Sequence, residues 1–311
     1  MAAEGWYILD SHGEIYAVKG VVQPPDRFYA IPKRVRGPEG YVKLPTLGSA
    51  LDYLRRERPH YLFDDPYTGR VQPAVPHNHI SGLLRPSQTL SDNVPEGLRR
   101  DALDLLEVLG SGEDLGFTGS LLYGLARPDS DIDLVAYGLD FGRRLYGRLA
   151  RLRAEGVTAS VGLSSLPSLL AGRRDSLQAL QMAILHEGRK VLTGLFRGRL
   201  FMVKLVPWPH EYPESWSRTR CRPLGRAASR FRVLDAGMGI YTPSQYIVEP
   251  VESCPHPVSI VVSFRSRFAE HCREGEVIEV VGTLEEVSDG GRSFLRVVVG
   301  WEPEDTIVRI G

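Results

Sequence analysis

The spacing of hydrophobic residues changes twice along this 311-residue chain. Up to about residue 95, short apolar runs alternate with turn residues and prolines, and 6–9 and 14–18 are expected to form a hairpin. Helical periodicity then alternates with short apolar strands, and the last third returns to runs rich in β-branched residues. We therefore expect three domains, at 1–95, 96–208 and 209–311.

The middle segment has the clearest periodicity. Leu98, Ala102 and Leu105 recur at helical spacing and predict a helix over 95–109. The same reasoning predicts a helix over 121–126, one over 141–155 and a long helical region ending at 187. It predicts strands at 115–120, 131–137, 157–162, 190–192 and 200–206. Alternating strands and helices indicate an α/β class for this segment.

The two flanking segments are expected to be β-rich. Near the C-terminus, 258–264, 277–284 and 294–299 predict strands, and a hairpin loop at 289–291 joins the last two. A small antiparallel barrel or sandwich is expected there.

Composition and charge exclude several classes of protein. The 38 basic residues balance the 38 acidic ones, which argues against a protein that coats nucleic acid uniformly. No secretory signal and no stretch of about 20 apolar residues is visible, so no membrane partner is expected. Three cysteines, at 221, 254 and 272, do not form a paired disulfide framework. A cytoplasmic location is therefore expected.

One stretch of the middle segment carries chemistry. Gly119 and Ser120 lie between a predicted strand and a predicted helix, where free backbone N–H groups are able to hold a phosphate. Asp131 and Asp133 follow on a second strand, and their spacing places both carboxylates on one face. Two neighbouring carboxylates repel each other unless a cation lies between them. As oxygen ligands they suit Mg²⁺, with Mn²⁺ as the alternative.

The segment 118–135 resembles the DNA polymerase beta-type nucleotidyltransferase superfamily, and in particular its minimal members. The resemblance rests on Gly119-Ser120 followed, after a short helix, by Asp131 and Asp133 between apolar residues. The whole chain also resembles predicted archaeal nucleotidyltransferases. The resemblance implies an α/β (α+β) nucleotidyltransferase core with a mixed sheet. It also implies that Gly119 and Ser120 bind the triphosphate, and that the two aspartates bind the metal and are catalytic.

The sequence departs from the family pattern at a third carboxylate, which usually lies on a later strand. The predicted strand at 157–162 has no acid, and the strand at 200–206 offers Lys204 instead. Glu249 is a remote candidate, although a solvated glutamate at a strand end is the more ordinary interpretation. The missing acid bears on turnover more than on nucleotide binding.

Six arginines form a second candidate feature. They fall within 15 residues that contain no Asp or Glu: Arg218, Arg220, Arg222, Arg226, Arg230 and Arg232. Such a cluster suits a nucleic-acid backbone or a triphosphate. The alternative is an arginine face paired with acids from elsewhere in the fold, in a chain that has 33 Arg and 5 Lys.

Three functions remain open from the sequence. The first is a Mg²⁺-dependent nucleotidyltransferase that moves an NMP from an NTP to a hydroxyl of RNA, a protein or a small molecule. The second is a catalytically weak regulatory protein that binds nucleotide and nucleic acid. The third is an antitoxin-like enzyme that nucleotidylates a partner protein.

Overall fold

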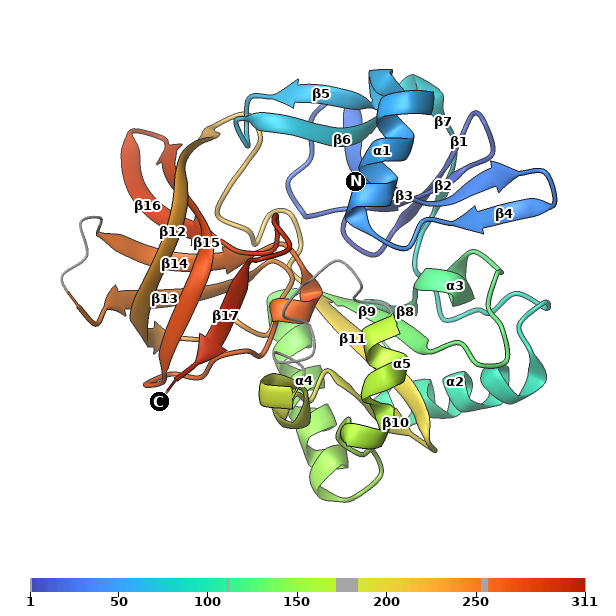
Figure 1. The fold of residues 1–311 in the computed structure, drawn as a ribbon. Helices are drawn as coiled ribbons and strands as arrows, with labels where there is room; N and C mark the ends of the chain where they lie inside the picture. The colour runs from blue at the N-terminus through green and yellow to red at the C-terminus, as the bar shows by residue number, and fades with distance from the viewer. Residues whose placement is uncertain (1, 111, 172–183, 253–256, 311) are drawn as a thin grey trace.

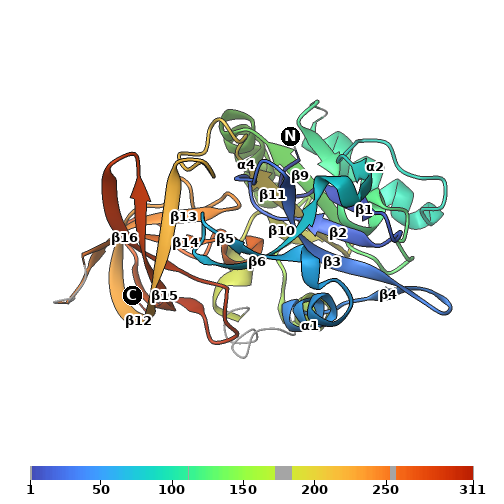
Figure 2. The same ribbon diagram turned by 90° about the horizontal axis from the view of Figure 1, so that it is seen from above.

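The computed structural model describes residues 2–110, 112–171, 184–252 and 257–310. They form three β-sheets, of seven, four and six strands. Figure 1 shows the first sheet above the middle one, and the third sheet beside both; Figure 2 shows the same arrangement from above. Within the described ranges, none of the helices combines the length and apolar character needed to cross a bilayer.

The first sheet has the strand order β5-β6-β3-β2-β1-β7, and β4 extends β3. Its strands are β1 (Tyr7–Asp10), β2 (Ile15–Val18), β3 (Arg27–Gly37), β4 (Gly40–Lys43), β5 (Leu62–Asp65), β6 (Arg70–Pro76) and β7 (Ile80–Leu84). The expected hairpin is confirmed, since β1 and β2 pair antiparallel. Helix α1 (Leu47–Glu57) begins at Thr46, whose side chain accepts a hydrogen bond from the Ser49 amide. The short helices η1 (Pro59–Tyr61) and η2 (His77–His79) complete this part.

The middle sheet has the order β10-β11-β9-β8. Its strands are β8 (Leu115–Phe117), β9 (Ile132–Tyr137), β10 (Thr193–Phe196) and β11 (Arg199–Val206). Its helices are α2 (Glu96–Leu109), α3 (Gly119–Leu122), α4 (Leu139–Ala154) and α5 (Leu166–Ala171), with η3 (Leu163–Ser165) and η4 (Glu187–Arg189). The main hydrophobic core joins α2 and α4 to one face of β9 and β11. The helices and strands expected near 95–109, 115–120, 131–137, 141–155 and 200–206 are therefore confirmed.

Two expectations for the middle segment need comment. The strand expected at 157–162 is wrong, because its backbone forms only an isolated bridge between Ala159 and Leu195. The helical region expected up to Glu187 includes residues outside the described ranges. What the structure describes of it is α5 before those residues and, after them, a helical stretch at 184–186 that leads into η4.

The third sheet has the order β12-β13-β14-β16-β15-β17, and β12 also pairs with β15. Its strands are β12 (Thr219–Asp235), β13 (Ser244–Pro250), β14 (Val258–Ser263), β15 (Val277–Asp289), β16 (Arg292–Val298) and β17 (Thr306–Arg309), and η5 (Ser266–Phe268) follows β14. Because β12 pairs with both β13 and β15, the sheet closes on itself around its own core. Cys221 and Cys272 are buried and free, and Cys254 lies outside the described residues.

Buried side chains join the three sheets. Ala3 and Val21 pack against Val135 and Val206 on the face of the middle sheet that lies away from α2 and α4. Tyr29, Tyr67 and Ala74 of the first part share a cluster with Cys221 and Val287 of the third. The first sheet therefore lies directly against the middle one. The division of the chain into domains at 95 and 208 stays a prediction.

The expected fold class, an α/β (α+β) nucleotidyltransferase core with a mixed sheet, is wrong for this protein. The structure is mostly β, with 40% of residues in strands and 23% in helices. Helical periodicity is prominent only in the middle segment, whereas the two outer sheets have seven and six strands. The class is therefore set by the flanking segments, whose short strands and prolines give a weaker signal in the sequence.

Candidate functional site

The two predicted metal-binding aspartates lie on the face of the middle sheet that meets the first sheet. Asp133 is on β9, and Asp131 immediately precedes this strand. Strand alternation sends Ile132 and Leu134 into the core beneath the helices. Asp133 therefore points to the opposite face, together with Val135, which packs against the N-terminal segment.

The Gly119 turn lies against this carboxylate. The Thr118 amide donates a hydrogen bond to the Asp133 carbonyl over 2.9 Å, which fixes the turn beside β9. Gly119 has φ of 61°, and a Cβ at this position would collide with Oδ2 of Asp133. Glycine fits this position because it adopts a positive φ without strain and has no Cβ to collide with the carboxylate. The Thr118 hydroxyl donates to the Gly5 carbonyl over 2.5 Å instead of capping α3, so no side chain caps the first amides of this turn.

The carboxylate pair carries more negative charge than its protein surroundings balance. Burial raises the pKa of Asp133, and the neighbouring Asp131 raises it further, while Lys204 and Lys43 lower it only in part. Among the described residues, no group of three or more His, Cys, Asp or Glu side chains is arranged to hold a metal ion. Two carboxylates still fit Mg²⁺ or Mn²⁺, because these ions commonly complete their shell with water and substrate phosphates.

Glu4 connects the N-terminal segment to this site. Its carboxylate is 2% exposed and accepts hydrogen bonds from Lys19 over 2.9 Å and from Lys204 over 3.1 Å. The amide of Gly20 donates to the same carboxylate over 3.1 Å. Burial alone would raise the pKa of Glu4, but the two ammonium groups outweigh it and lower the pKa to about 2. Glu4 is therefore ionised and committed to the lysines.

Aromatic residues from both sheets border the aspartates. Tyr7 of β1 and Tyr123, which follows α3, meet edge to face with ring centroids 4.9 Å apart. The guanidinium of Arg34 on β3 lies 5.9 Å from the ring centroid of Tyr123. Burial raises the pKa of Tyr7 well above its usual range, and interactions with Tyr123 and with the carboxylate of Asp133 add to this shift. The first sheet thus forms one wall of the candidate site.

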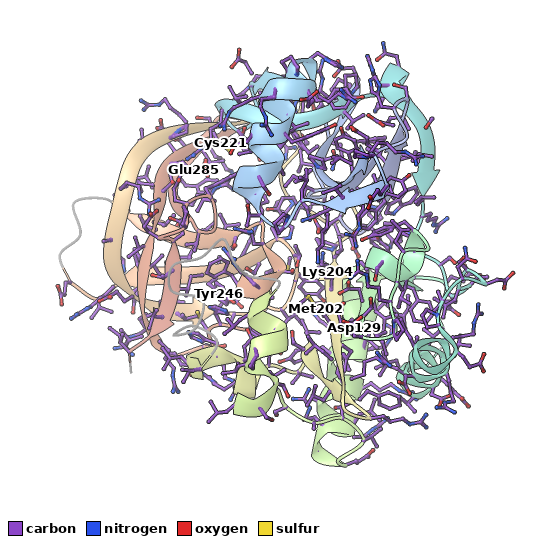
Figure 3. The ribbon with its side chains drawn as sticks, turned by 45° about the vertical axis from the view of Figure 1, so that its right-hand side comes forward. Asp129, Met202, Lys204, Cys221, Tyr246 and Glu285 are labelled. Atoms are coloured by element: carbon purple, nitrogen blue, oxygen red, sulfur yellow. The ribbon has the colours of Figure 1, made fainter. Side chains whose placement is uncertain are left out.

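The segment 157–162, where the family would carry a third acid, contains none and is not a strand, and the next candidate strand, β11, carries other side chains there. Strand β11 runs parallel to β9, and Met202 pairs with Asp133 in the register. Lys204, two residues further along the same face, is close enough to Asp133 for its charge to act on the carboxylate. Figure 3 shows Lys204 and Met202 near the centre of the molecule, below the first sheet. Glu249 lies instead on β13 of the third sheet, 3.8 Å from Arg232.

Five of the six arginines lie on β12, and Arg218 immediately precedes it, so all six belong to the third sheet and not to the strands that carry the aspartates. Arg222 and Arg230 stand opposite Glu286 and Glu279 of β15, with ion pairs of 2.7 and 3.3 Å. Further pairs join Arg218 to Asp289, Arg226 to Asp305 and Arg232 to Glu249. Arg220 donates to backbone carbonyl groups of Trp216 and Thr219. This geometry favours the alternative of an arginine face paired with acids. A nucleic-acid contact there stays a prediction.

Reasoning from the sequence missed the lysines of the first sheet. Only five lysines occur in the chain. Four of them act electrostatically on Glu4, on Asp133 or on one another: Lys19, Lys33, Lys43 and Lys204. The signal available was their rarity beside 33 arginines, but nothing in the sequence indicated that they converge.

Comparisons with known proteins add little about activity. The chain is similar to an uncharacterized protein from the archaeon Methanocaldococcus jannaschii, with 25% identity over 321 aligned residues that cover 94% of each chain. No protein-family model matches the chain, and no solved structure matches it. The similarity to the archaeal protein extends over all three sheets, so the two chains share their length and order of segments.

Proposed function

We propose that this protein is a metal-dependent nucleotidyltransferase. It would transfer an NMP from an NTP to an acceptor hydroxyl and release pyrophosphate. The observation that carries the proposal is the contact between the Gly119 turn and Asp133, beside Asp131. This contact brings uncapped backbone amides next to two carboxylates whose charge is not balanced. Phosphate and a divalent cation are the ligands that such a pair of features suits.

The residues of this chain would act mainly by positioning and electrostatics. Asp131 and Asp133 would hold Mg²⁺ or Mn²⁺, which neutralises charge on the phosphates. Backbone amides at Gly119 and Ser120 would hold phosphate oxygens. The acceptor oxygen then bonds to the α-phosphorus, the bond from this phosphorus to the bridging oxygen breaks, and the hydroxyl proton passes to solvent.

The direct test uses NTPs labelled at the α-phosphate. The protein is incubated with each NTP, Mg²⁺ and either total cellular RNA or total protein, and label is sought in macromolecules. Label in RNA identifies an RNA acceptor, and label in protein identifies a protein acceptor. Asp131→Asn and Asp133→Asn should abolish the transfer, whereas the exposed neighbour Asp129→Asn should retain it. Equal labelling by Asp133→Asn and the parent protein would exclude this site.

A second candidate function follows from Met202 and Lys204, which occupy the strand where a third acid is expected. The protein would then bind nucleotide as a regulatory signal without turnover. Binding of Mg-NTP that depends on Asp131 and Asp133, with no label transferred to any macromolecule, would support this alternative.

A further inference from the structure

Positive charge is concentrated around Glu4, at the boundary between the first and middle sheets, and one of these charges, that of Lys204, also acts on Asp133. Lys19 follows β2, Lys33 is on β3 and Lys204 is on β11. The guanidinium of Arg265, which follows β14, is near enough to act on Lys19 and Lys33. Glu4 supplies the one carboxylate that two of these lysines contact directly, through Oε1. Three ammonium groups, those of Lys19, Lys33 and Lys204, are thus within electrostatic reach of Glu4, and its carboxylate contacts two of them.

Lys33 shows the consequence of this imbalance most clearly. Within the described ranges its ammonium group forms no ion pair, unlike those of Lys19 and Lys204. Burial lowers its pKa to about 7, and repulsion by Lys19, Lys204 and Arg265 adds to the shift, which Glu4 counteracts only partly. A cation held in such a place is unfavourable for the fold unless an anion joins it.

The cluster and the aspartates form one continuous site. Lys204 donates to Glu4 on one side and interacts electrostatically with Asp133 on the other. Tyr7 lies within electrostatic reach of both Glu4 and Asp133. A substrate group bound by the aspartates through a metal ion would thus extend towards the lysines.

We propose that Lys19, Lys33 and Lys204 form a second phosphate-binding subsite, which holds the polyphosphate chain of the substrate on the side of the aspartates opposite the Gly119 turn. Ammonium groups suit this ligand because each acts as a compact charge with three donors, and a polyphosphate carries several charged oxygens. The identity of the substrate as an NTP rests on the proposed function, whereas the binding of polyphosphate by the lysines does not. The first sheet is then part of the substrate site.

The test measures binding of inorganic tripolyphosphate by calorimetry in the presence of a chelator, so that no divalent metal contributes. The parent protein should bind tripolyphosphate, and Lys33→Gln should weaken the affinity about tenfold, with a weaker dependence on salt. The matched control is Arg56→Gln, which removes one positive charge from the exposed face of α1. It should leave the affinity unchanged. No binding by the parent protein, or equal binding by Lys33→Gln, would overturn the subsite.

Further variants separate this proposal from the proposed function. Asp131→Asn combined with Asp133→Asn should retain or tighten the binding of tripolyphosphate in chelator, because it removes negative charge, while it abolishes nucleotide transfer. If no NTP is ever transferred but tripolyphosphate binding still requires Lys33, the subsite stands and the enzymatic activity does not. If a short oligoribonucleotide without a terminal phosphate competes for Lys33 and tripolyphosphate does not, the ligand is a nucleic-acid backbone and the proposal is wrong.

Discussion

The carboxylate of Glu4 accepts a hydrogen bond from the ammonium group of Lys204, with 3.1 Å between Oε1 and Nζ, across 200 positions of sequence. The same oxygen accepts from Lys19 over 2.9 Å. One buried acid thus ties the N-terminal segment and the first sheet to strand β11. This contact fixes the position of Lys204, whose charge acts on Asp133.

The first prediction concerns this acid. Glu4→Gln should lower the free energy of unfolding at pH 7 by about 2–4 kcal/mol, because it leaves buried ammonium groups without a counter-charge. The folded-state pKa of Glu4, about 2, lies below its usual value, so its contribution is present above about pH 4 and is lost as the pH falls through 2. Chemical denaturation should therefore show a smaller difference in the free energy of unfolding between Glu4→Gln and the parent protein at pH 2–3 than at pH 7. The exposed Glu39→Gln is the control.

The second prediction concerns Gly119. Gly119→Ala should destabilise the protein through its positive φ, by about 1–2 kcal/mol, and also displace the Asp133 carboxylate. Mg-NTP binding, measured by calorimetry, should be lost. The control is Gly124→Ala: φ is 71° there, but the nearest atom to a new Cβ is the Ser91 hydroxyl oxygen at 3.7 Å. Loss of binding in both variants would indicate backbone strain rather than contact with Asp133.

The third prediction concerns the cost of the carboxylate pair. Burial and Asp131 raise the pKa of Asp133, so the folded state holds a proton that the unfolded state releases above about pH 4. Stability should consequently fall as the pH rises through the folded-state pKa. In chelator at pH 8, Asp133→Asn should raise the free energy of unfolding by about 1–2 kcal/mol. If Asp133→Asn instead lowered the free energy of unfolding clearly, while the control Asp129→Asn left it unchanged, the charged pair would support the fold.

The fourth prediction concerns Lys33. Its pKa of about 7 in the folded state is below the ordinary value near 10.5, so the unfolded state binds more protons between these two values. Stability should therefore rise with pH across this window. Lys33→Gln should be more stable than the parent protein at pH 6, on the order of 1–2 kcal/mol after allowance for solvent screening. Thermal unfolding should show a smaller stability advantage of Lys33→Gln over the parent protein at pH 9 than at pH 6. An equal advantage at both pH values would contradict the lowered pKa of Lys33.

The fifth prediction concerns the arginine face of β12. Because Arg222 and Arg230 are exposed and each stands opposite an acid on β15, replacing either with Gln should change stability by less than about 1 kcal/mol. If the protein binds RNA, the variant that combines Arg222→Gln with Arg230→Gln should show the same dependence of RNA affinity on salt as the parent protein. A slope reduced by about one unit for each lost contact would instead assign these arginines to a nucleic-acid surface.

The sequence by itself determined the local elements of the middle segment and the placement of two aspartates on one strand face. Leu98, Ala102 and Leu105 predict α2 because helical periodicity is a local property. Alternation alone likewise puts Ile132 and Leu134 opposite Asp133. The strand expected at 157–162 failed because Val157 and Ala159 stay exposed and no ladder forms; only Ala159 finds a partner, in an isolated bridge to Leu195.

The tertiary structure decided the fold class and the composition of the site. In the part of the chain that the structure describes, seventeen strands assemble into three sheets through pairings between distant segments, and no local pattern specifies such pairings. The charges that act on Asp133 come from the neighbouring Asp131, from Lys43 on β4 and from Lys204 on β11, and the two lysines lie far from it in sequence. Electrostatic interaction depends on distance and burial rather than on sequence separation. For this reason the lysines became visible as a group only when the first sheet was packed against the middle one.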